Sequence, residues 1–424
     1  MSELRNIAVT PQACAADFLV IGAGVLGLSI ACALKRRLPQ ARVDVLEKER
    51  APGLHSSGRN SGVLHSGLYY PPGSLKARLC RQGALEMARF HEVHGLRLQR
   101  CGKLLVPTNP AFAAEMATLA ERAQANGVRV ETVDEKTLAR LEPETRSATG
   151  TALWVPNTAV GSPAAVMTAL VKTAQALGVG IRCDAELVQA APERQEARLR
   201  TGELLRYGHL IAAAGLHADR VAHLFGVGLR YHLLPFRGLY WQLAPASGIR
   251  LNHLIYPVPD LRILYLGVHT TTATDGGIYL GPTAVPAFGR AHYQGWTGIS
   301  WREAPRMIKH LGQMIRRNQD GFRVQAWQEG RRYRKANFTE AARTLLPRLK
   351  PEHLLPAPGK TGLHPRIFDS ENGQLLKDFT LVDGPASTHI LGAVSPAWTC
   401  AFPLARHICD RILGGETECA KKGG

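Results

Sequence analysis

The chain has 424 residues, which is more than one compact domain of about 150 residues holds and therefore predicts two or three domains. Hydrophobic residues make up 45% of the chain and charged residues 20%, proportions that exclude a disordered or fibrous protein. The 52 Lys and Arg exceed the 34 Asp and Glu by 18, so we expect attraction to anions: acidic small molecules, anionic lipid surfaces or nucleic acid.

The eight cysteines are scattered and form no CxxC pair. The spacings of zinc-ribbon and iron–sulfur sites are therefore absent, and no metal is predicted. Scattered thiols without a disulfide framework are typical of a reducing compartment. The first 17 residues have the pattern of neither a secretion signal nor a transit peptide, so we expect a cytoplasmic protein.

Residues 18–34, FLVIGAGVLGLSIACAL, carry no charge and approach the ~17-residue minimum for a transmembrane helix. Their three glycines argue against one continuous helix, because each interior glycine costs about 1 kcal/mol. A buried strand over 18–21, a glycine turn and a helix from 25 to about 34 fit better. With a second strand over 41–47, this segment predicts a βαβ unit.

The glycine turn has the spacing GxGxxG, formed by Gly22, Gly24 and Gly27. The first glycine permits a tight turn, the second lets backbone approach a pyrophosphate, and the third lets the helix pack closely on the strand. The start of the helix then offers free N–H groups to phosphates. Glu47 follows Gly27 by 20 residues, where a carboxylate accepts hydrogen bonds from ribose hydroxyls. The pattern predicts dinucleotide binding; the alternative is a glycine turn between core elements.

Residues 55–70, HSSGRNSGVLHSGLYY, follow the second strand directly. Two glycines disfavour a helix in the first half of this segment, and its polar residues have no amphipathic period. We expect a loop whose backbone N–H groups lie along a large planar cofactor. The alternative is an exposed loop rich in turn formers.

These motifs resemble the L-2-hydroxyglutarate dehydrogenase/oxidase family of the FAD-dependent D-amino-acid-oxidase superfamily. The resemblance covers roughly residues 17 to 413. Its motifs are GRNSGVLHSGLYY, SLKARLCRQG, CGKLLVP, PFRGLYW, NHLIYPVPD, LGVHTT, GPTAVPAF and AVSPAWT. It implies FAD chemistry, oxidation of a 2-hydroxy acid such as L-2-hydroxyglutarate to a 2-oxo acid, and transfer of the electrons to a quinone or to oxygen.

The resemblance also implies the fold: an α/β protein (α+β overall). It combines an FAD-binding Rossmann-like βαβ domain of the glutathione-reductase/D-amino-acid-oxidase type with an interleaved mixed-sheet substrate domain. We expect the FAD-binding domain to be discontinuous, and the ranges predicted for it are 1–90, 151–230 and 356–424. The ranges predicted for the substrate domain are 91–150 and 231–355.

Within this scheme, a strand around 181–187 is expected to run past the adenine. The apolar run that ends at Ala214-Gly215 resembles the strand that returns the chain to the cofactor domain. Residues 388–413 indicate a strand, a turn and a helix, which brings the C-terminal end of the chain to the same domain. The cofactor contacts that we expect, partly from the motif and partly from the resemblance, are Gly22, Gly24, Val25, Gly27, Glu47, Lys48, Ser57, Arg59, Asn60, Ser61, Gly62, Leu187, Ala214, Gly215, Gly362, Ser395, Pro396, Ala397 and Trp398.

Oxidation of a hydroxy acid by hydride transfer needs a base that takes the hydroxyl proton, and histidine has the pKa best suited to this task. Of the sixteen histidines, we expect His269 to be the base and His65 to contact substrate or flavin. His269 is expected at the end of a strand, ILYLGVH. Others, such as His91 and His310, lie in helix-like charged stretches and are expected in solvent.

The substrate carboxylates need cations or hydrogen-bond donors, and arginine offers a planar bidentate fork. The resemblance implies Arg237 and Tyr256 on the substrate-domain sheet, with Lys103 as a further candidate. The family pattern close to PAGVRAQ reads KTGLHPR at 360–366 here, so the arginine, Arg366, lies two places further on. This departure leaves the identity of the acid open, because a shifted arginine moves the anion that it holds.

Two further departures concern Arg59, which stands where the family often has histidine, and Trp398, which stands where a small residue is usual. An indole beside the flavin or the adenine would reshape that pocket.

Residues 302–350 contain thirteen Lys or Arg and four Asp or Glu, a surplus of nine positive charges. The run is either a solvated face or a patch for peripheral contact with anionic lipid, as on an inner membrane where quinone is reduced. Nucleic acid is ranked last as a partner, because no nucleic-acid-binding module is recognisable.

Three hypotheses for the function remain open. The first is FAD-dependent oxidation of L-2-hydroxyglutarate. The second is the same chemistry on another hydroxy acid, an amino acid or glycerol phosphate. The third is a flavin-carrying protein that binds RNA or a membrane.

Overall fold

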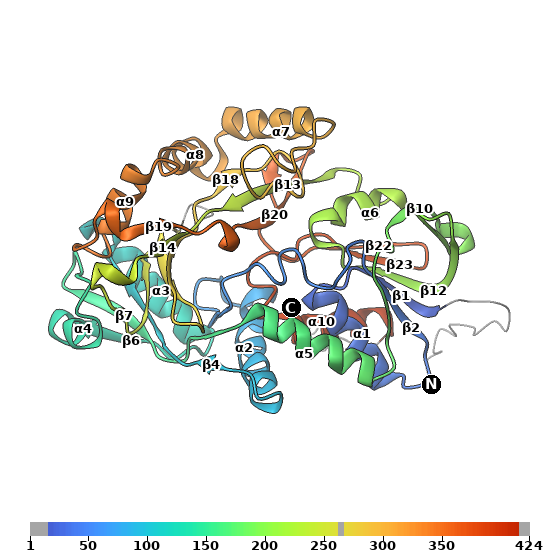
Figure 1. Ribbon diagram of the computed structural model, residues 1–424, viewed down its shortest axis with the longest axis horizontal. Coiled ribbons are helices and arrows are strands. Elements are labelled where there is room, and N and C mark those ends of the chain that lie inside the picture. Colours follow the sequence, from blue (N-terminus) through green and yellow to red (C-terminus); the bar gives the residue numbers. More distant parts are fainter. Residues whose placement is uncertain (1–15, 262–266, 415–424) are drawn as a thin grey trace, which may run out of the picture. The chain divides into compact units, whose positions relative to one another are not determined.

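The structure is a computed structural model that describes residues 16–261 and 267–414, and it divides the chain into two units (Figure 1). Unit 1 comprises residues 1–58, 164–233 and 376–424, and unit 2 comprises residues 59–163 and 234–375. The chain therefore enters and leaves each unit more than once.

The predicted cofactor domain also included residues 59–90, 151–163 and 356–375, which lie in unit 2. Sheet pairing accounts for much of this difference, because residues 63–64 pair with 159–160 and a strand over 362–369 joins a sheet of unit 2. Which of these segments contact the cofactor stays a prediction.

Unit 1 is built on a mixed sheet of eight strands. Its main path, in spatial order, is β10 (Leu187–Ala191), β11 (Glu196–Leu199), β12 (Leu204–Ala212), β1 (Ala16–Ile21), β2 (Val43–Leu46) and β9 (Gly180–Arg182). Strand β23 (Ser387–Ile390) joins the end of β12 in parallel and carries β22 (Leu381–Gly384) on its other side. β12 thus pairs with β1 from the N-terminal segment and with β23 from the C-terminal segment, as the resemblance implies.

Helices cover both faces of this sheet. Alternate residues of β1 face opposite ways: Leu19 and Ile21 pack in a cluster with α6 (Ala218–Leu224), while Val20 faces α1 (Val25–Arg37). α1 lies beside α10 (Ala401–Ile412), and Arg37 of α1 forms an ion pair of 2.7 Å with Asp410 of α10 (Figure 1). The predicted βαβ unit is confirmed, with α1 one turn longer than expected.

The strand predicted over 181–187 is wrong. β9 ends at Arg182 and pairs with β2, and β10 begins at Leu187 and pairs with β11. Asp184 between them has φ +52°, a left-handed conformation that breaks an extended strand.

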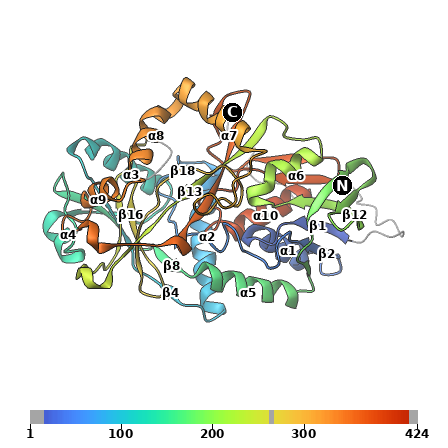
Figure 2. The ribbon, with the colours of Figure 1, turned by 45° about the horizontal axis from the view of Figure 1, so that its top comes forward.

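In the described residues, unit 2 contains four small sheets (Figure 2). In spatial order they are β18 (Val285–Pro286), β13 (Tyr231–Gly238), β20 (Gly362–Asp369) and β21 (Gln374–Leu375); β16 (His269–Thr272), β17 (Ile278–Gly281), β14 (Trp241–Leu243) and β19 (Leu354–Pro356); β15 (Leu254–Pro257), β5 (Lys103–Val106), β7 (Thr151–Val155) and β6 (Glu131–Asp134); β3 (Val63–Leu64), β8 (Ala159–Gly161) and β4 (Leu98–Gln99).

The helices of unit 2 lie against these sheets. They are α2 (Leu75–Val93), α3 (Ala113–Ala125), α4 (Glu135–Leu141), α7 (Ala304–Arg317), α8 (Phe322–Arg331) and α9 (Lys335–Arg343), while α5 (Pro163–Ala176) leads the chain back into unit 1. α7 and α8 lie near β13 (Figure 2). They pack on the sheet that contains β13 and β20, with Met307, Phe322 and Phe368 in one core. None of the helices in the described residues combines the length and apolarity that a membrane crossing requires.

Two histidines expected in solvent are buried. His91 of α2 has no exposed surface and its Nδ1 lies 2.7 Å from the carbonyl oxygen of Met87, and His310 of α7 is 6% exposed. Both stand on the inward faces of their helices. The charged residues around them in the sequence led to the wrong prediction of exposure.

Candidate active site

The glycine turn of unit 1 leaves no room for side chains. Gly22 has φ +105°, and a Cβ there would lie 2.6 Å from the carbonyl oxygen of Ala213. A Cβ on Gly27 would lie 1.9 Å from the carbonyl oxygen of Gly22. Both positions therefore require glycine: the first for its conformation and the second for close packing of α1 on the turn. The same contact places Ala213 and the predicted Ala214 and Gly215 over the turn.

The start of α1 is arranged as an anion-binding end. Gly24 is its N-cap, and the backbone N–H of Val25 donates to Ser57 Oγ at 2.9 Å. A Cβ on Gly24 would lie 2.9 Å from the same Oγ. No acidic residue lies in the first turn, so the positive end of the helix is not neutralised locally. Three predicted cofactor residues are thus brought together.

Glu47 follows β2 and holds the glycine turn. Its Oε2 accepts from the backbone N–H of Ala23 at 3.0 Å, and its Oε1 accepts from that of Glu49 at 3.0 Å. Lys48 forms an ion pair with Glu49, and Lys48 and His55 together lower the pKa of Glu49 to about 2. A carboxylate oxygen can accept more than one hydrogen bond, so the predicted ribose contact of Glu47 remains open.

The C-terminal cofactor candidates, Ser395, Pro396, Ala397 and Trp398, form the turn before α10. Trp398 is 9% exposed, and within the described part of the chain its indole Nε1 has no hydrogen-bond partner. A buried donor without a partner is costly, so this N–H fits a ligand acceptor. Leu187, the remaining candidate of unit 1, opens β10.

Five cofactor candidates lie in unit 2. A Cβ on Gly362 would lie 2.7 Å from the carbonyl oxygen of Arg59, so these two backbone segments touch. Gly62 has φ +74° and its N–H donates to Asn60 Oδ1 at 2.9 Å. Asn60 and Ser61 line a small pocket whose other lining residues are Tyr240, Thr271, Ala273, Tyr279 and Lys360.

The unit 1 features together fit a dinucleotide cofactor such as FAD. Glycine is enforced where backbone must approach a phosphate, the first turn of α1 carries no acidic residue, and among the described residues a buried indole donor lacks a partner. Gly22, Gly24, Val25 and Ser57 would hold the pyrophosphate.

The predicted base stands where two strands touch. The backbone N–H of Ile255 in β15 donates to Thr270 Oγ1 of β16 at 2.8 Å, and the neighbouring rings of Tyr256 and His269 stack with centroids 3.9 Å apart. His269 Nδ1 donates to the carbonyl oxygen of Gly267 at 2.9 Å. Because a carbonyl can only accept, the neutral ring carries its proton on Nδ1 and leaves the lone pair of Nε2 for a substrate proton.

The position of His269 corrects one expectation. It was predicted to end a strand, but it is the first residue of β16. Residues 263–266 of that predicted strand lie outside the described residues.

Lys103, the first residue of β5, is a fully buried amine. Its Nζ lies 3.4 Å from Tyr69 Oη and 4.6 and 5.2 Å from the ring centroids of Tyr69 and Tyr256. Burial lowers the pKa of Lys103 to about 7. Tyrosine faces stabilise the ammonium only in part, so its charge is poorly compensated until an anion arrives.

His65 follows β3, where its carbonyl oxygen accepts from Cys80 Sγ at 3.2 Å. Burial first, and then the charges of Lys103 and His269, lower the pKa of His65 to about 3. Burial and the charge of Lys103 also lower the pKa of His269, to about 4. Four predicted residues and Tyr69, which was not predicted, therefore form one group; His65, Tyr69, Lys103, Tyr256 and His269 are called the His269 cluster below.

The two predicted arginines have different surroundings. The charge of Arg366 in β20 acts on His364 two residues before it, and burial together with that charge lowers the pKa of His364 to about 4. The charge of His364 acts in turn on His269. The charged groups described around Arg237 are Tyr333 and His292 rather than members of the His269 cluster.

Sequence reasoning missed Tyr69, Tyr240 and His364 as site residues. Tyr69 lies in the motif GRNSGVLHSGLYY, but nothing in the sequence around this tyrosine indicates a role in the site. His364 could have been found, because it stands two residues before Arg366 in a strand and hence on the same face.

Comparison with known proteins gives the family. The sequence profile of the FAD dependent oxidoreductase family matches residues 17–411. The L-2-hydroxyglutarate dehydrogenase of Escherichia coli (strain K12) is 36% identical over 399 residues, which are 93% of this chain and 93% of that protein. The mitochondrial L-2-hydroxyglutarate dehydrogenase of Homo sapiens is 31% identical over 417 residues, 93% of this chain and 88% of that protein.

Solved structures share the fold at lower identity. The L-alpha-glycerophosphate oxidase from Mycoplasma pneumoniae with FAD bound gives a TM-score of 0.73 at 21% identity, covering 95% of both chains. The glycine oxidase from Geobacillus kaustophilus gives 0.69 at 17%, covering 96% of this chain and 99% of that one. The chain therefore belongs to the FAD dependent oxidoreductase family and, within it, to the L-2-hydroxyglutarate dehydrogenase family.

Proposed function

We propose that the protein oxidises L-2-hydroxyglutarate to 2-oxoglutarate with FAD as its cofactor. The observation that carries this proposal is the His269 cluster, in which a buried amine and a neutral imidazole of fixed tautomer both lie against the ring of Tyr256. Among the described residues, none of the neighbours whose charge acts on Lys103 or His269 is a carboxylate. Such a site favours an anion that carries a hydroxyl group.

The reaction removes a proton from the substrate hydroxyl and a hydride from C2. FAD, when bound, would supply the acceptor for the hydride. His269 Nε2 takes the proton, while the Gly267 carbonyl keeps Nδ1–H and so holds the ring in place. The substrate carboxylates favour the imidazolium that forms, because opposite charges nearby raise the pKa of a histidine.

The direct test is an anaerobic mixture of the purified protein with L-2-hydroxyglutarate, followed at the flavin band near ~450 nm. Rapid bleaching is expected, with the D-isomer inert. L-malate, L-lactate, D-amino acids and glycerol 3-phosphate are the comparison substrates. A protein that carries FAD and is bleached faster by one of these acts on that compound instead.

His269→Asn tests the base. Asparagine can still donate to the Gly267 carbonyl but has no basic nitrogen, so flavin reduction is expected to slow by ~10²–10⁴ while FAD stays bound. His310→Asn is the matched control, because His310 is buried to the same degree, 6% against 8% exposed, but lies on α7. An unchanged rate in His269→Asn would remove this residue as the base.

We also propose that quinone or oxygen takes the electrons and that the protein contacts the inner membrane through residues 302–350. This region and the residues just before it carry exposed apolar side chains as well as charge. Trp296 and Trp301 before α7 are 81% and 74% exposed, and Trp327 on α8 is 61% exposed. Exposed tryptophans beside basic residues are typical of proteins that bind the interface of a bilayer.

Both helices repeat one pattern on their outer faces. On α7, Ile308 and Ile315 are exposed and Lys309 and Arg316 flank them. On α8 the apolar pair is Val324 and Trp327 and the basic pair is Arg323 and Arg331.

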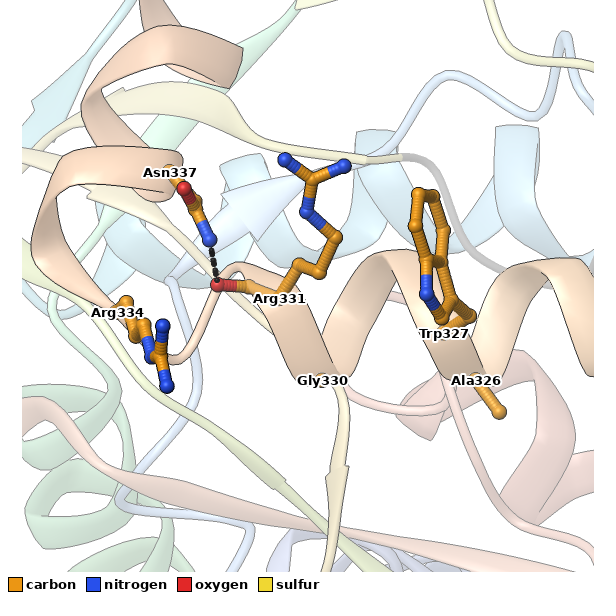
Figure 3. Close-up of a pocket in the computed structure, with 6 residues that line it drawn as sticks. All are labelled: Ala326, Trp327, Gly330, Arg331, Arg334 and Asn337. Atoms are coloured by element: carbon orange, nitrogen blue, oxygen red, sulfur yellow. Dashed lines mark hydrogen bonds between the residues drawn. The ribbon is translucent and has the colours of Figure 1, made fainter.

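Figure 3 shows that Arg331 and Trp327 stand side by side on α8, with the guanidinium 4.7 Å from the ring centroid. They line a surface pocket of about 560 Å³. Between residues 302 and 334, all of them described, Asp320 is the one exposed acid, since Glu303 and Glu329 are buried.

The test is flotation with vesicles of phosphatidylcholine, with and without phosphatidylglycerol. Binding is expected only to the anionic vesicles. Lys309→Gln with Arg316→Gln is expected to weaken it about 30-fold, at about 1 kcal/mol per charge, and Ile315→Ser with Trp327→Ser to remove the salt-resistant part. Leu85→Ser and Arg89→Gln on α2 are the controls, because they remove an apolar group, 67% exposed, and an exposed charge elsewhere. Equal binding to neutral vesicles, or RNA binding at moderate salt without lipid binding, would contradict this assignment.

A further inference from the structure

The residues of the site outside the His269 cluster stand on two strands, β20 and β13. His364 and Arg366 lie two residues apart on β20, so their side chains project from the same face of the sheet. The ring of His364 lies over β13: its Nε2 is 3.1 Å from the place that a Cβ on Gly238 would take. The same Cβ would lie 2.9 Å from Pro282 Cβ. Glycine at 238 therefore makes room for the imidazole.

These contacts lead from His364 to the predicted base. Pro282 follows Gly281, and Gly281 of β17 is paired with His269 of β16 in the antiparallel register. The Gly281-Pro282 segment thus lies beside both residues, and the charge of His364 acts on His269. Arg366 extends the same face beyond His364.

Lys103 approaches His269 from another direction. The ring of Tyr256 carries His269 stacked on it, 3.9 Å between centroids, and has the ammonium of Lys103 5.2 Å from its centre. The charge of Lys103 acts on His269 directly, whereas the charge of Arg366 acts on His364, whose charge acts on His269.

A 2-hydroxy dicarboxylate has the same asymmetry. One of its carboxylates is bonded to the carbon that carries the reacting hydroxyl, and the other is separated from that carbon by two methylene groups in 2-hydroxyglutarate. We infer that Lys103 holds the carboxylate next to the hydroxyl, and that His364 and Arg366 hold the distant one. This assignment rests on the proposed function, and it makes His364 and Arg366 the residues that select dianions over monoanions.

The sequence departure at 360–366 acquires a physical meaning here. A shift of two residues along a strand keeps the arginine on the same face and moves it by about 6.6 Å. His364 occupies the place so vacated. In this assignment the distant carboxylate accepts from an imidazole N–H of His364 and from the guanidinium of Arg366.

The test compares L-2-hydroxyglutarate with L-2-hydroxybutanoate, which lacks only the distant carboxylate. Arg366→Gln and His364→Leu are expected to raise KM for the dicarboxylate by about 10- to 100-fold, the range for a lost hydrogen bond to a charged group. The change in KM for L-2-hydroxybutanoate is expected to be smaller, because this acid has no distant carboxylate, so the ratio of the two KM values reports the selection of the dianion. Lys103→Met is expected to raise KM for both acids, and Arg366→Lys to restore part of the dicarboxylate preference.

Binding of substrate analogues keeps the inference separate from turnover. Glutarate and butanoate have no hydroxyl to oxidise, so calorimetry with the FAD-loaded protein reports recognition alone. Arg366→Gln is expected to weaken the binding of glutarate and to leave the binding of butanoate unchanged. If the Arg366 and His364 variants weaken the binding of both ligands equally, or if neither variant weakens the binding of glutarate, the assignment is wrong. If the parent binds glutarate selectively but L-2-hydroxyglutarate does not bleach its flavin, the proposed reaction fails and the dianion site stands.

Discussion

The residue that most constrains the chemistry of this site is Lys103, whose amine is buried and, among the described residues, has no carboxylate whose charge acts on it. Lys103 has no exposed surface, and its neighbours are tyrosine rings, Cys80 and two histidines. Burial raises the pKa of Tyr69 and Tyr256, and the pKa values of His65 and His269 fall to about 3 and 4. Near neutral pH, Lys103 is therefore the member of the His269 cluster that changes its charge.

This predicts the pH dependence of kcat/KM. The pKa of Lys103 is lowered to about 7, so the free protein holds the cation below that pH and loses it above. kcat/KM for L-2-hydroxyglutarate is expected to fall as pH rises through about 7, approaching tenfold per unit. kcat, which reports the bound complex, should hold to higher pH because the carboxylate favours the charged amine.

Lys103→Arg is the control for this profile. A guanidinium stays protonated throughout the range, so the fall above pH 7 is expected to disappear, whatever the change in absolute rate. If the same fall persists in Lys103→Arg, another group causes it.

At the scale of elements, the βαβ unit was predictable because its signals are local. The glycine spacing, the uncharged run and the acid at a fixed distance all lie within 31 residues, from 17 to 47. The structure has the predicted strand, turn and helix in this segment, followed by β2. The break between β9 and β10 was not predictable, because Asp184 adopts its left-handed conformation without a glycine or proline to announce it.

Gly24→Val tests the function of the glycine turn. A side chain there would collide with Ser57 Oγ, which lies 2.9 Å from the Cβ position, and would close the space that a pyrophosphate needs. The purified variant is expected to lose its flavin, measured as the ratio of absorbance near ~450 nm to that of the protein. Gly312→Val is the control, because nothing lies within 4 Å of a Cβ on that exposed helical glycine. A Gly24→Val protein with a normal flavin content would overturn the assignment of the turn.

At the scale of the whole molecule, the sheet of unit 1 joins segments from opposite ends of the chain. β12 holds β1 on one side and β23 on the other, and α10 packs against α1. Loop closure costs free energy that grows only slowly with length, so such distant segments can share one core.

A protein cut after residue 375 tests this interleaving. It would lack β22, β23 and α10, whose Leu404 and Ile408 have no exposed surface, and unit 1 is expected to lose its cooperative unfolding transition and its FAD. Thermal unfolding and flavin content are the measurements. Adding residues 376–424 as a separate chain should restore both in part. Full flavin retention by the shortened protein would show that the C-terminal segment is dispensable.

The sequence by itself determined the family, the cofactor class and the first βαβ unit, because these depend on residues close together in the chain or on motifs of unusual composition. It also named four members of the His269 cluster, although it did not show that they meet. Only the tertiary structure decided that Lys103 is buried and acts by its charge on His269, that the charge of His364 acts on His269 and that of Arg366 on His364, and that Arg237 has other neighbours. The physical reason is that burial, tautomer and pKa are set by groups far apart along the chain, such as Lys103 and His269, which are 166 residues apart and approach each other through the pairing and packing of strands.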